Sequence, residues 1–192
     1  MVGRFKNTYY DFPSERELSG GAAVRLYDAS CQPVAQVSSE FFERMCVQGS
    51  GTLTSGDTVS FAKRDCSCAA TCPRTQQRLC FDRLDAASFP WGRGATGRPI
   101  TALRSLAVDP SVVPMGSLVY VPEFDGLSLP GGAEHDGCFI AQDRGMWVKG
   151  RHIDVFAGTP AMRMTLEKQV ATGSGVTVIL DSPRCPRVAA PG

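Results

Sequence analysis

Turn-forming residues divide this 192-residue chain into short segments, because it contains 20 glycines and 13 prolines. Neither residue fits well inside a helix or a strand, so few long elements can form. The apolar runs between the turns are short and often alternate with polar residues, which is typical of β-strands. The sequence therefore predicts a mainly β fold with many short strands. The clearest candidates are residues 59–63, 103–108, 118–121, 138–142, 152–156 and 176–180.

One or two short helices interrupt this pattern. Ser39 is a candidate N-cap for a helix over 40–46, with an acidic residue in the first turn. Thr159 is a candidate N-cap for a second helix, and Pro160 suits its first position. Apolar residues recur at intervals of four after Pro160, and we expect Gly173 to end the helix.

Eight cysteines indicate how the chain is held together. Their even number favours an oxidising compartment and a disulfide framework, although spacing alone does not give the pairing. Four of them form a compact set, Cys66, Cys68, Cys72 and Cys80, for which a structural zinc site is the alternative. We favour disulfides, because a C-x-C step with uneven gaps differs from the usual zinc pattern.

Composition narrows the class of protein. The chain has 20 basic and 19 acidic side chains, which argues against a protein that follows nucleic-acid phosphates. Its 43% apolar content is typical of a globular protein, and no apolar run reaches the length of a membrane span. No signal peptide follows Met1, so we expect that it has been removed or that export uses another route. Together with the cysteines, this predicts a periplasmic or extracellular protein.

Three aspartates stand where strand-like apolar runs end or are interrupted: Asp109, Asp143 and Asp154. If they met in one groove, burial and mutual repulsion would raise the pKa of at least one, as an acid catalyst requires near neutral pH. The alternative is ordinary turn formation, because Asp before Pro and Asp before Arg-Gly are common in turns.

The strand predicted over 152–156 separates two kinds of side chain. Alternation places His152, Asp154 and Phe156 on one face and the two intervening aliphatic residues on the other. Asp154 can therefore face a cleft while its neighbours face the core.

Two longer motifs resemble a known signature. They are Ala107-Val108-Asp109-Pro110-x3-Pro114-x-Gly116 and Ala141-x-Asp143-x-Gly145-x3-Lys149-Gly150-x2-Ile153-Asp154-Val155-Phe156. Together they resemble the 3D (three-aspartate) domain of A-type membrane-bound lytic transglycosylases, including the step of eleven residues between its last two aspartates. The firm match covers about 100–158. Weaker resemblances lie upstream, in Thr8-Tyr9-Tyr10 and in Gln48-Gly49-Ser50-Gly51-x-Leu53.

The resemblance implies a double-psi β-barrel of six strands, a fold related to barwin and expansin domains. It predicts a single domain over 1–192, with the barrel core at about 100–182 and additional N-terminal strands over 5–62. Residues 63–98, rich in Cys, Arg, Gly and Pro, are expected to form a disulfide-tied insertion. The end of the chain, 182–192, is expected to be irregular and tied down by Cys185.

The resemblance also implies an activity. Members cleave the β-1,4 bond between N-acetylmuramic acid and N-acetylglucosamine of peptidoglycan and leave a 1,6-anhydro end. Asp154 would be the general acid and then the base. Asp143 would hold sugar hydroxyls and raise the pKa of Asp154, and Asp109 would fix the groove or the substrate. No cofactor and no metal are expected.

Further residues are expected to bind the glycan. Trp147 departs from the small residue usual in the family, and it either stacks on a sugar or packs in the core. The Glu134–Asp136 trio is expected to be a polar loop, because adjacent residues make a poor metal site. The candidate substrate-binding residues are Tyr9, Tyr10, Gly49, Gly51, Gly145, Trp147 and Lys149.

Two other functions remain open from the sequence. One is an inverting glycoside hydrolase on the same barrel, with Asp154 as acid and Asp143 as base. The other is an expansin-like protein that binds or loosens the wall without breaking bonds. In each case the expected partner is the glycan of the cell wall and the expected state is a monomer.

Overall fold

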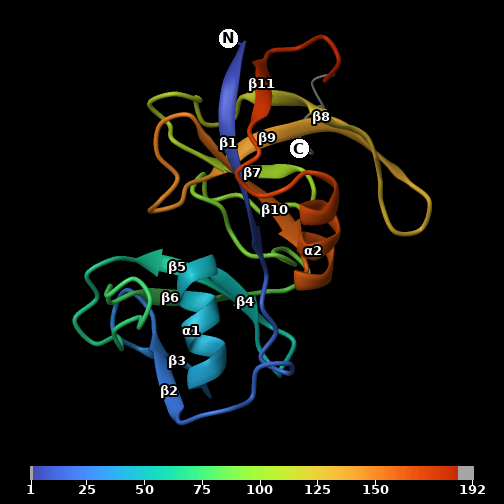
Figure 1. Ribbon diagram of the computed structural model, residues 1–192. Helices are drawn as coiled ribbons and strands as arrows, with labels where there is room; N and C mark the ends of the chain where they lie inside the picture. The colour runs from blue at the N-terminus through green and yellow to red at the C-terminus, as the bar shows by residue number, and fades with distance from the viewer. Residues whose placement is uncertain (1, 186–192) are drawn as a thin grey trace. The chain divides into compact units, whose positions relative to one another are not determined.

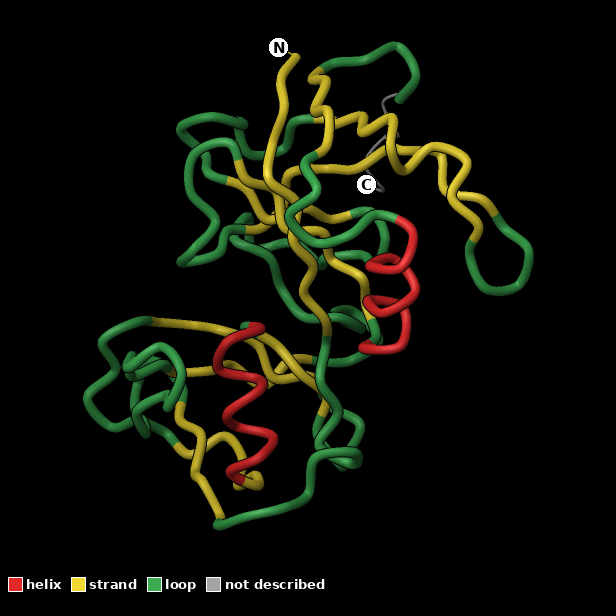
Figure 2. The backbone as a smooth tube through the Cα atoms, in the orientation of Figure 1, coloured by secondary structure: helices red, strands yellow, loops and turns green. Residues whose placement is uncertain are grey.

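The computed structural model describes residues 2–185, and its contacts group them into two compact units. One unit contains 2–10 and 94–185, and the other contains 11–93 (Figures 1 and 2). The sequence predicted one domain in which 63–98 is an insertion of the barrel. The structure instead groups 63–93 with 11–62, because these segments share a hydrophobic core of their own.

The first unit is a closed barrel of six strands, which confirms the predicted fold class. Strands β7 and β9 run parallel, and the pairings β10–β7, β8–β9, β11–β8 and β1–β11 are antiparallel. In barrel order the strands are β1 (Val2–Asp11), β10 (His152–Gly158), β7 (Ser105–Val108), β9 (Glu134–Asp143), β8 (Leu118–Ser128) and β11 (Val176–Leu180).

Side-chain alternation explains how the barrel is filled. Ile153 and Val155 of β10 are fully buried in the core cluster, as predicted, and Leu106 and Val108 of β7 join them. The intervening residues of both strands therefore lie on the outer surface of the barrel. This surface carries the polar residues described below.

Strands β8 and β9 extend as a hairpin beyond the barrel (Figure 1). The expected polar loop at 134–136 is wrong, because Glu134–Asp136 belong to β9 and His135 is only 2% exposed. The His135 ring stacks on Phe139 at 4.7 Å, and its Nε2 atom bonds the carbonyl of Leu103 at 2.8 Å. Pairing with β8 turns the His135 side of the segment toward the core. The sequence prediction failed because all three residues are polar, which is typical of a loop.

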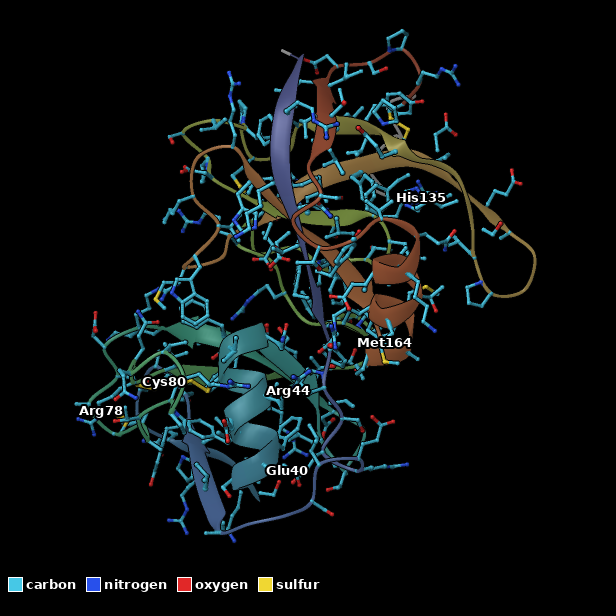
Figure 3. All side chains as sticks on the ribbon, viewed as in Figure 1. Glu40, Arg44, Arg78, Cys80, His135 and Met164 are labelled. Carbon is cyan, nitrogen blue, oxygen red and sulfur yellow. A yellow bond between two sulfur atoms is a disulfide. The ribbon has the colours of Figure 1, made fainter. Side chains whose placement is uncertain are left out.

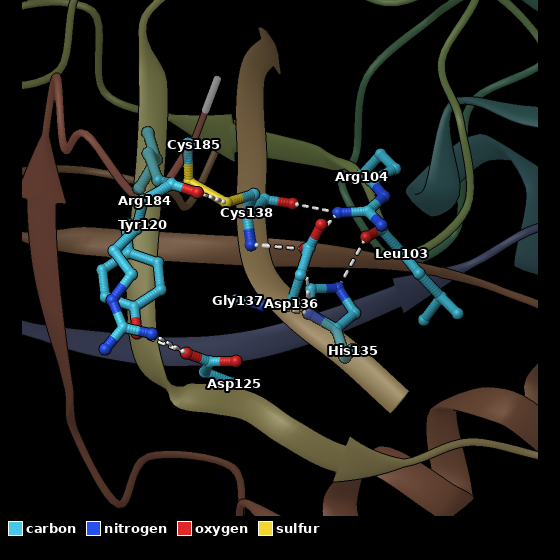
Figure 4. Close-up of polar contacts among 11 residues, drawn as sticks. Leu103, Arg104, Tyr120, Asp125, His135, Asp136, Gly137, Cys138, Arg184 and Cys185 are labelled. Atoms are coloured by element: carbon cyan, nitrogen blue, oxygen red, sulfur yellow. Dashed lines mark hydrogen bonds and ion pairs between the residues drawn. A yellow bond between two sulfur atoms is a disulfide. The ribbon is translucent and has the colours of Figure 1, made fainter. Parts of the chain in front are cut away.

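A disulfide between Cys138 and Cys185 ties the end of the described chain to β9, as the sequence predicted for Cys185 (Figure 4). Beside it, Arg104 pairs with Asp136 and also donates to the carbonyl of Cys138. The rest of the tail, 186–192, lies outside the described residues.

Helix α2 (Pro160–Gln169) packs against the barrel through Leu166, which is fully buried. Its N-cap is confirmed, because the Thr159 side chain accepts a hydrogen bond from the backbone of Met162. The predicted end is wrong, since the helix ends at Gln169 and Val170 is its C-cap. Gly173 instead donates its N–H to the carbonyl of Asn7.

The second unit combines a helix with two small sheets. Its helix begins one residue earlier than predicted from its cap, because Ser38 rather than Ser39 accepts from the Phe41 backbone. Arg44 lies on this helix (Figure 3). Its guanidinium pairs at 3.3 Å with the buried carboxyl of Asp11. The elements are β2 (Ala23–Tyr27), β3 (Pro33–Ser38), α1 (Ser39–Gln48), β4 (Ser50–Thr52), β5 (Thr58–Lys63) and β6 (Cys80–Leu84).

Three disulfides hold this second unit together, which confirms the disulfide framework. The compact set of four cysteines does not act as one group, because only Cys66 and Cys80 pair within it. The other two members bond to distant residues. The three bonds are Cys31–Cys68, Cys46–Cys72 and Cys66–Cys80.

The packing of α2 leads to a stability prediction. Leu166→Ala removes a fully buried side chain from the barrel core, so it should lower the free energy of unfolding by about 2–5 kcal/mol. Met164→Ala on the same helix removes a side chain that is 52% exposed and should change it by about 0.5 kcal/mol or less. Urea unfolding followed by circular dichroism, with the disulfides intact, measures both. Equal losses would contradict the packing described here.

Candidate active site

Strand register brings two of the three aspartates together. Asp154 on β10 pairs with Ala107 of β7, and Ala107 pairs on its other side with Asp143 of β9. Paired residues point to the same side of a sheet, so both carboxyls lie on the outer surface of the barrel with a small side chain between them. The negative charge of Asp143 contributes to raising the pKa of Asp154.

A β-bulge sets the direction of Asp143. The register between β7 and β9 shifts by one residue, so that Leu106 pairs with Ala141 but Ala107 pairs with Asp143. Gln142 is the extra residue, and its amide oxygen accepts a hydrogen bond from Ser105 at 2.6 Å. Without this bulge, Asp143 would point toward the barrel interior with Ala141.

The side chain of Asp154 is half-buried and has few hydrogen-bond partners. Burial raises its pKa to about 7, and the charge of Asp143 adds to the rise. The hydroxyl of Thr8 donates to its Oδ1 atom at 2.7 Å and, with the charge of Lys6, opposes the rise. A carboxyl with this pKa carries a proton in about half of the molecules at neutral pH, which a general acid needs.

Asp143 is half-buried too, but it accepts hydrogen bonds from more donors. Its Oδ1 atom accepts from the backbones of Arg144 at 2.8 Å and Ala95 at 3.2 Å, and its Oδ2 atom accepts from the Tyr10 hydroxyl at 3.1 Å. Burial raises its pKa, and these donors oppose the rise because they favour the ionised form. Of the two carboxyls, Asp154 is therefore the better candidate for a group that still carries a proton near neutral pH and can donate it.

Asp109 has a different environment. It accepts from the backbone of Gly150 at 2.8 Å and from the backbone and hydroxyl of Ser111 at 3.0 and 2.7 Å. These bonds, the one from Gly150 first, lower its pKa to about 2. Asp109 is thus ionised at neutral pH and anchors the loop between β9 and β10.

That loop carries three of the predicted substrate-binding residues. The Trp147 side chain is 59% exposed, so packing in the core is excluded for it. Lys149 is exposed as well and lies near enough to Asp109 to help lower its pKa. Gly145 lets the loop fold tightly, because a Cβ atom there would lie 2.5 Å from Val148.

The other predicted binding residues have partners within their own unit. Tyr10 lies beside the candidate acids, with its ring 4.9 Å from that of Phe156 and its hydroxyl on Asp143. Tyr9 packs against the barrel core, and its hydroxyl donates to the carbonyl of Val170 at 2.6 Å. In the second unit, Gly49 caps α1 in a left-handed conformation and Gly51 leaves room for Phe41.

Sequence reasoning missed two polar partners of the acid. Thr8 contacts Asp154 directly, and the His152 Nε2 atom lies 2.8 Å from the same hydroxyl. Alternation did place His152 on the face of Asp154. No signal in the sequence linked Thr8 to a residue 146 positions away.

Potential metal ligands gather at one place in the described chain, at Cys31, Cys66 and Cys68. Each of these cysteines is in a disulfide, so none offers a thiolate. No helix within residues 2–185 is long and apolar enough to cross a membrane.

Comparison with known families matches residues 104–166 to the 3D domain. This part of the chain is a 3D domain. The match includes all three aspartates and confirms the resemblance that the sequence motifs predicted. Comparison of the sequence with curated proteins finds no match.

The fold around the 3D domain resembles solved lytic transglycosylases. Escherichia coli MltA with bound chitohexaose has 17% identity and a TM-score of 0.62, over 94% of this chain and 72% of that one. A membrane-bound lytic murein transglycosylase from Agrobacterium tumefaciens has 14% identity and a TM-score of 0.58, over 92% and 73%. Neisseria gonorrhoeae MltA has 14% identity and a TM-score of 0.54, over 93% and 72%. At these identities the comparison establishes a shared fold.

The stability contributions of Asp109 and Asp154 should depend on pH in opposite directions. The pKa of Asp154 is raised from 3.8 to about 7, so the folded protein binds this proton more tightly than the unfolded chain. Its contribution to stability therefore falls as the pH rises from about 4 to 7. Asp109, with a pKa lowered to about 2, stabilises the fold above pH 4 and loses this effect as the pH falls toward 2.

Asn substitutions isolate these contributions. The free energy of unfolding of Asp154→Asn, relative to that of wild type, should increase as the pH is raised from 5 to 8, by about a few kcal/mol. Asp109→Asn should lose stability over the whole of that range. Urea unfolding at both pH values measures the differences. A pH-independent effect of Asp154→Asn would show that the carboxyl is not buried in the way described.

Proposed function

We propose that this protein is a lytic transglycosylase that cleaves the β-1,4 bond between N-acetylmuramic acid and N-acetylglucosamine in peptidoglycan. The observation that carries the proposal is the half-buried carboxyl of Asp154, which has a pKa of about 7 and lies on the outer surface of the barrel in the 3D domain. The shared fold with lytic transglycosylases supports it. The four disulfides fit action in the periplasm or outside the cell.

One carboxyl can perform both proton transfers of this reaction. Protonated Asp154 donates to the glycosidic oxygen as the bond breaks and positive charge develops on the sugar. The resulting carboxylate then accepts the proton of the 6-hydroxyl of the same muramic acid, whose oxygen attacks C1 and closes the 1,6-anhydro ring. Asp154 ends the cycle protonated, and no water is consumed.

Asp143 is better suited to positioning than to proton transfer. Both of its oxygens already accept hydrogen bonds from Tyr10, Ala95 and Arg144. These bonds stabilise the ionised form of Asp143 and make it a weaker base for the water that an inverting hydrolase activates. Asp143 therefore raises the pKa of Asp154, stabilises positive charge on the sugar and holds its hydroxyls together with Tyr10.

A digest of purified sacculi tests the activity. Wild type should release muropeptides with 1,6-anhydro ends, and Asp154→Asn should lower their release by about 10²–10⁴-fold, because the general acid is lost. Asp181→Asn is the control, since this exposed residue has φ 55°, a conformation that Asn tolerates. Mass spectrometry identifies the ends. Reducing ends would show hydrolysis instead, and binding without release would show an expansin-like protein.

Trp147 supplies a sugar-stacking surface in this proposal. The Gly150 N–H donates to Asp109, and His152 Nδ1 bonds the Trp147 carbonyl, so the backbone of the loop that carries the exposed indole is anchored at two points. Together with Lys149 and the backbone of Gly145, it forms the substrate-binding part of this loop.

Substitution of the indole tests that role. Trp147→Ala should weaken binding to chitooligosaccharides by about tenfold, the effect expected for one aromatic stacking contact. Trp147→Phe should recover part of the loss, because a smaller aromatic face remains. Isothermal titration calorimetry measures both. Unchanged binding in Trp147→Ala would remove this residue from the site.

A further inference from the structure

A short hydrogen-bonded chain leads from the carboxyl of Asp154 to an imidazole. The Thr8 hydroxyl lies 2.7 Å from Asp154 Oδ1 and 2.8 Å from His152 Nε2. The other ring nitrogen of His152, Nδ1, lies 3.3 Å from the backbone carbonyl of Trp147. His152 is 8% exposed, so water has little access to the ring. The chain therefore contains a carboxyl, a hydroxyl, an imidazole and a carbonyl, in that order.

The carbonyl at the end of the chain fixes the proton on the ring. A carbonyl oxygen can only accept, so His152 Nδ1 must donate to Trp147. A neutral imidazole has one N–H, which leaves Nε2 without a proton. Nε2 of neutral His152 is therefore an acceptor that requires a donor, and Thr8 is in the position to be that donor.

Thr8 has only one hydroxyl proton for two neighbours. When Asp154 is protonated, its O–H donates to Thr8 and the Thr8 hydroxyl donates to His152, so that every group is satisfied. When Asp154 is ionised, it also requires the Thr8 proton, and either the carboxylate or the imidazole loses its donor. A buried acceptor without a donor has lost its bonds to water and gained none in return, which is unfavourable. Neutral His152 therefore favours the protonated carboxyl.

We propose that His152 is a positioning residue that acts on Asp154 through the rotatable hydroxyl of Thr8. The hydroxyl donates to His152 while Asp154 carries its proton and turns to Asp154 once the carboxyl has become a carboxylate. This inference rests on the proposed function for its use in catalysis. The competition keeps the acid protonated before bond cleavage, and the turned hydroxyl stabilises the carboxylate until it accepts the 6-hydroxyl proton. Asp154 gives one proton to the glycosidic oxygen and takes one from the 6-hydroxyl, so the proton balance of these groups is restored and the hydroxyl returns to His152 when the cycle ends.

Other charges near the chain of groups do not reproduce this effect. Lys6 of β1 lowers the pKa of both Asp154 and His152. Asp143 of β9 raises the pKa of Asp154, and the hydroxyl of Tyr10 is already bonded to Asp143. Burial is the largest cause of the lowered pKa of His152, which keeps the ring neutral at neutral pH. Lys6, Asp143 and Tyr10 remain in place when only the Thr8 hydroxyl or the imidazole is removed, so the variants below test the hydrogen bonds alone.

Two substitutions should move the pKa of Asp154 in opposite directions. His152→Leu removes the competing acceptor, so Thr8 always donates to the carboxylate and the pKa should fall below its wild-type value. Thr8→Val removes the donor to the carboxylate, so the pKa should rise above it. Thr8→Ser keeps the hydroxyl and is the matched control, with a pKa close to wild type. NMR titration of the ¹³C-labelled Asp154 carboxyl measures each value, and shifts in the same direction would overturn the proposal.

The wild-type protein provides a second test, which does not depend on the folding of any variant. The ¹⁵N shifts of neutral His152 should show the proton on Nδ1 and a free lone pair on Nε2. A proton on Nε2 of the neutral ring would overturn the proposal. Both NMR tests are independent of turnover, so an inactive protein in the sacculus digest would contradict the proposed function and leave this result intact.

Discussion

The site depends on burying the carboxyl of Asp154 on the outside of a barrel whose inside is already filled. Ile153 and Val155, on either side of it, are fully buried in the core, so the strand cannot turn to move the carboxyl into water. Thr8 is its one hydroxyl donor, which is too little to offset burial, and the pKa rises to about 7. The core thus supplies the free energy that holds an acid in its protonated form.

The environment gives the three aspartates of the 3D domain separate properties. Asp154 is half-buried with few donors, and its pKa of about 7 lets it carry a proton near neutral pH. Asp143 is half-buried with donors on both oxygens, which hold its carboxyl in place beside Asp154. Asp109 accepts from two backbone N–H groups and a hydroxyl, has a pKa of about 2, and anchors the loop between β9 and β10. Hydrogen-bond supply and burial, rather than residue type, separate these properties.

The two units are stabilised by different means. The barrel unit has a large core of aliphatic and aromatic residues from all six strands, together with one disulfide. The second unit, 11–93, has a smaller core around Phe41 and Phe81, together with three disulfides. A short segment buries less surface on folding, and cross-links compensate by restricting its unfolded chain.

The sequence by itself determined the features that depend on residues close together along the chain. Alternation gave five of the six barrel strands and β5, and it placed His152 on the face of Asp154. The caps gave both helices to within a few residues. Only the tertiary structure decided the bulge at Gln142 that turns Asp143 outward, the burial of His135, the pairing of the cysteines and the contact of Thr8 with Asp154. These features depend on which strand lies beside which, and at what register. That choice is made when the whole barrel closes, because no local pattern specifies a partner that is 146 residues away.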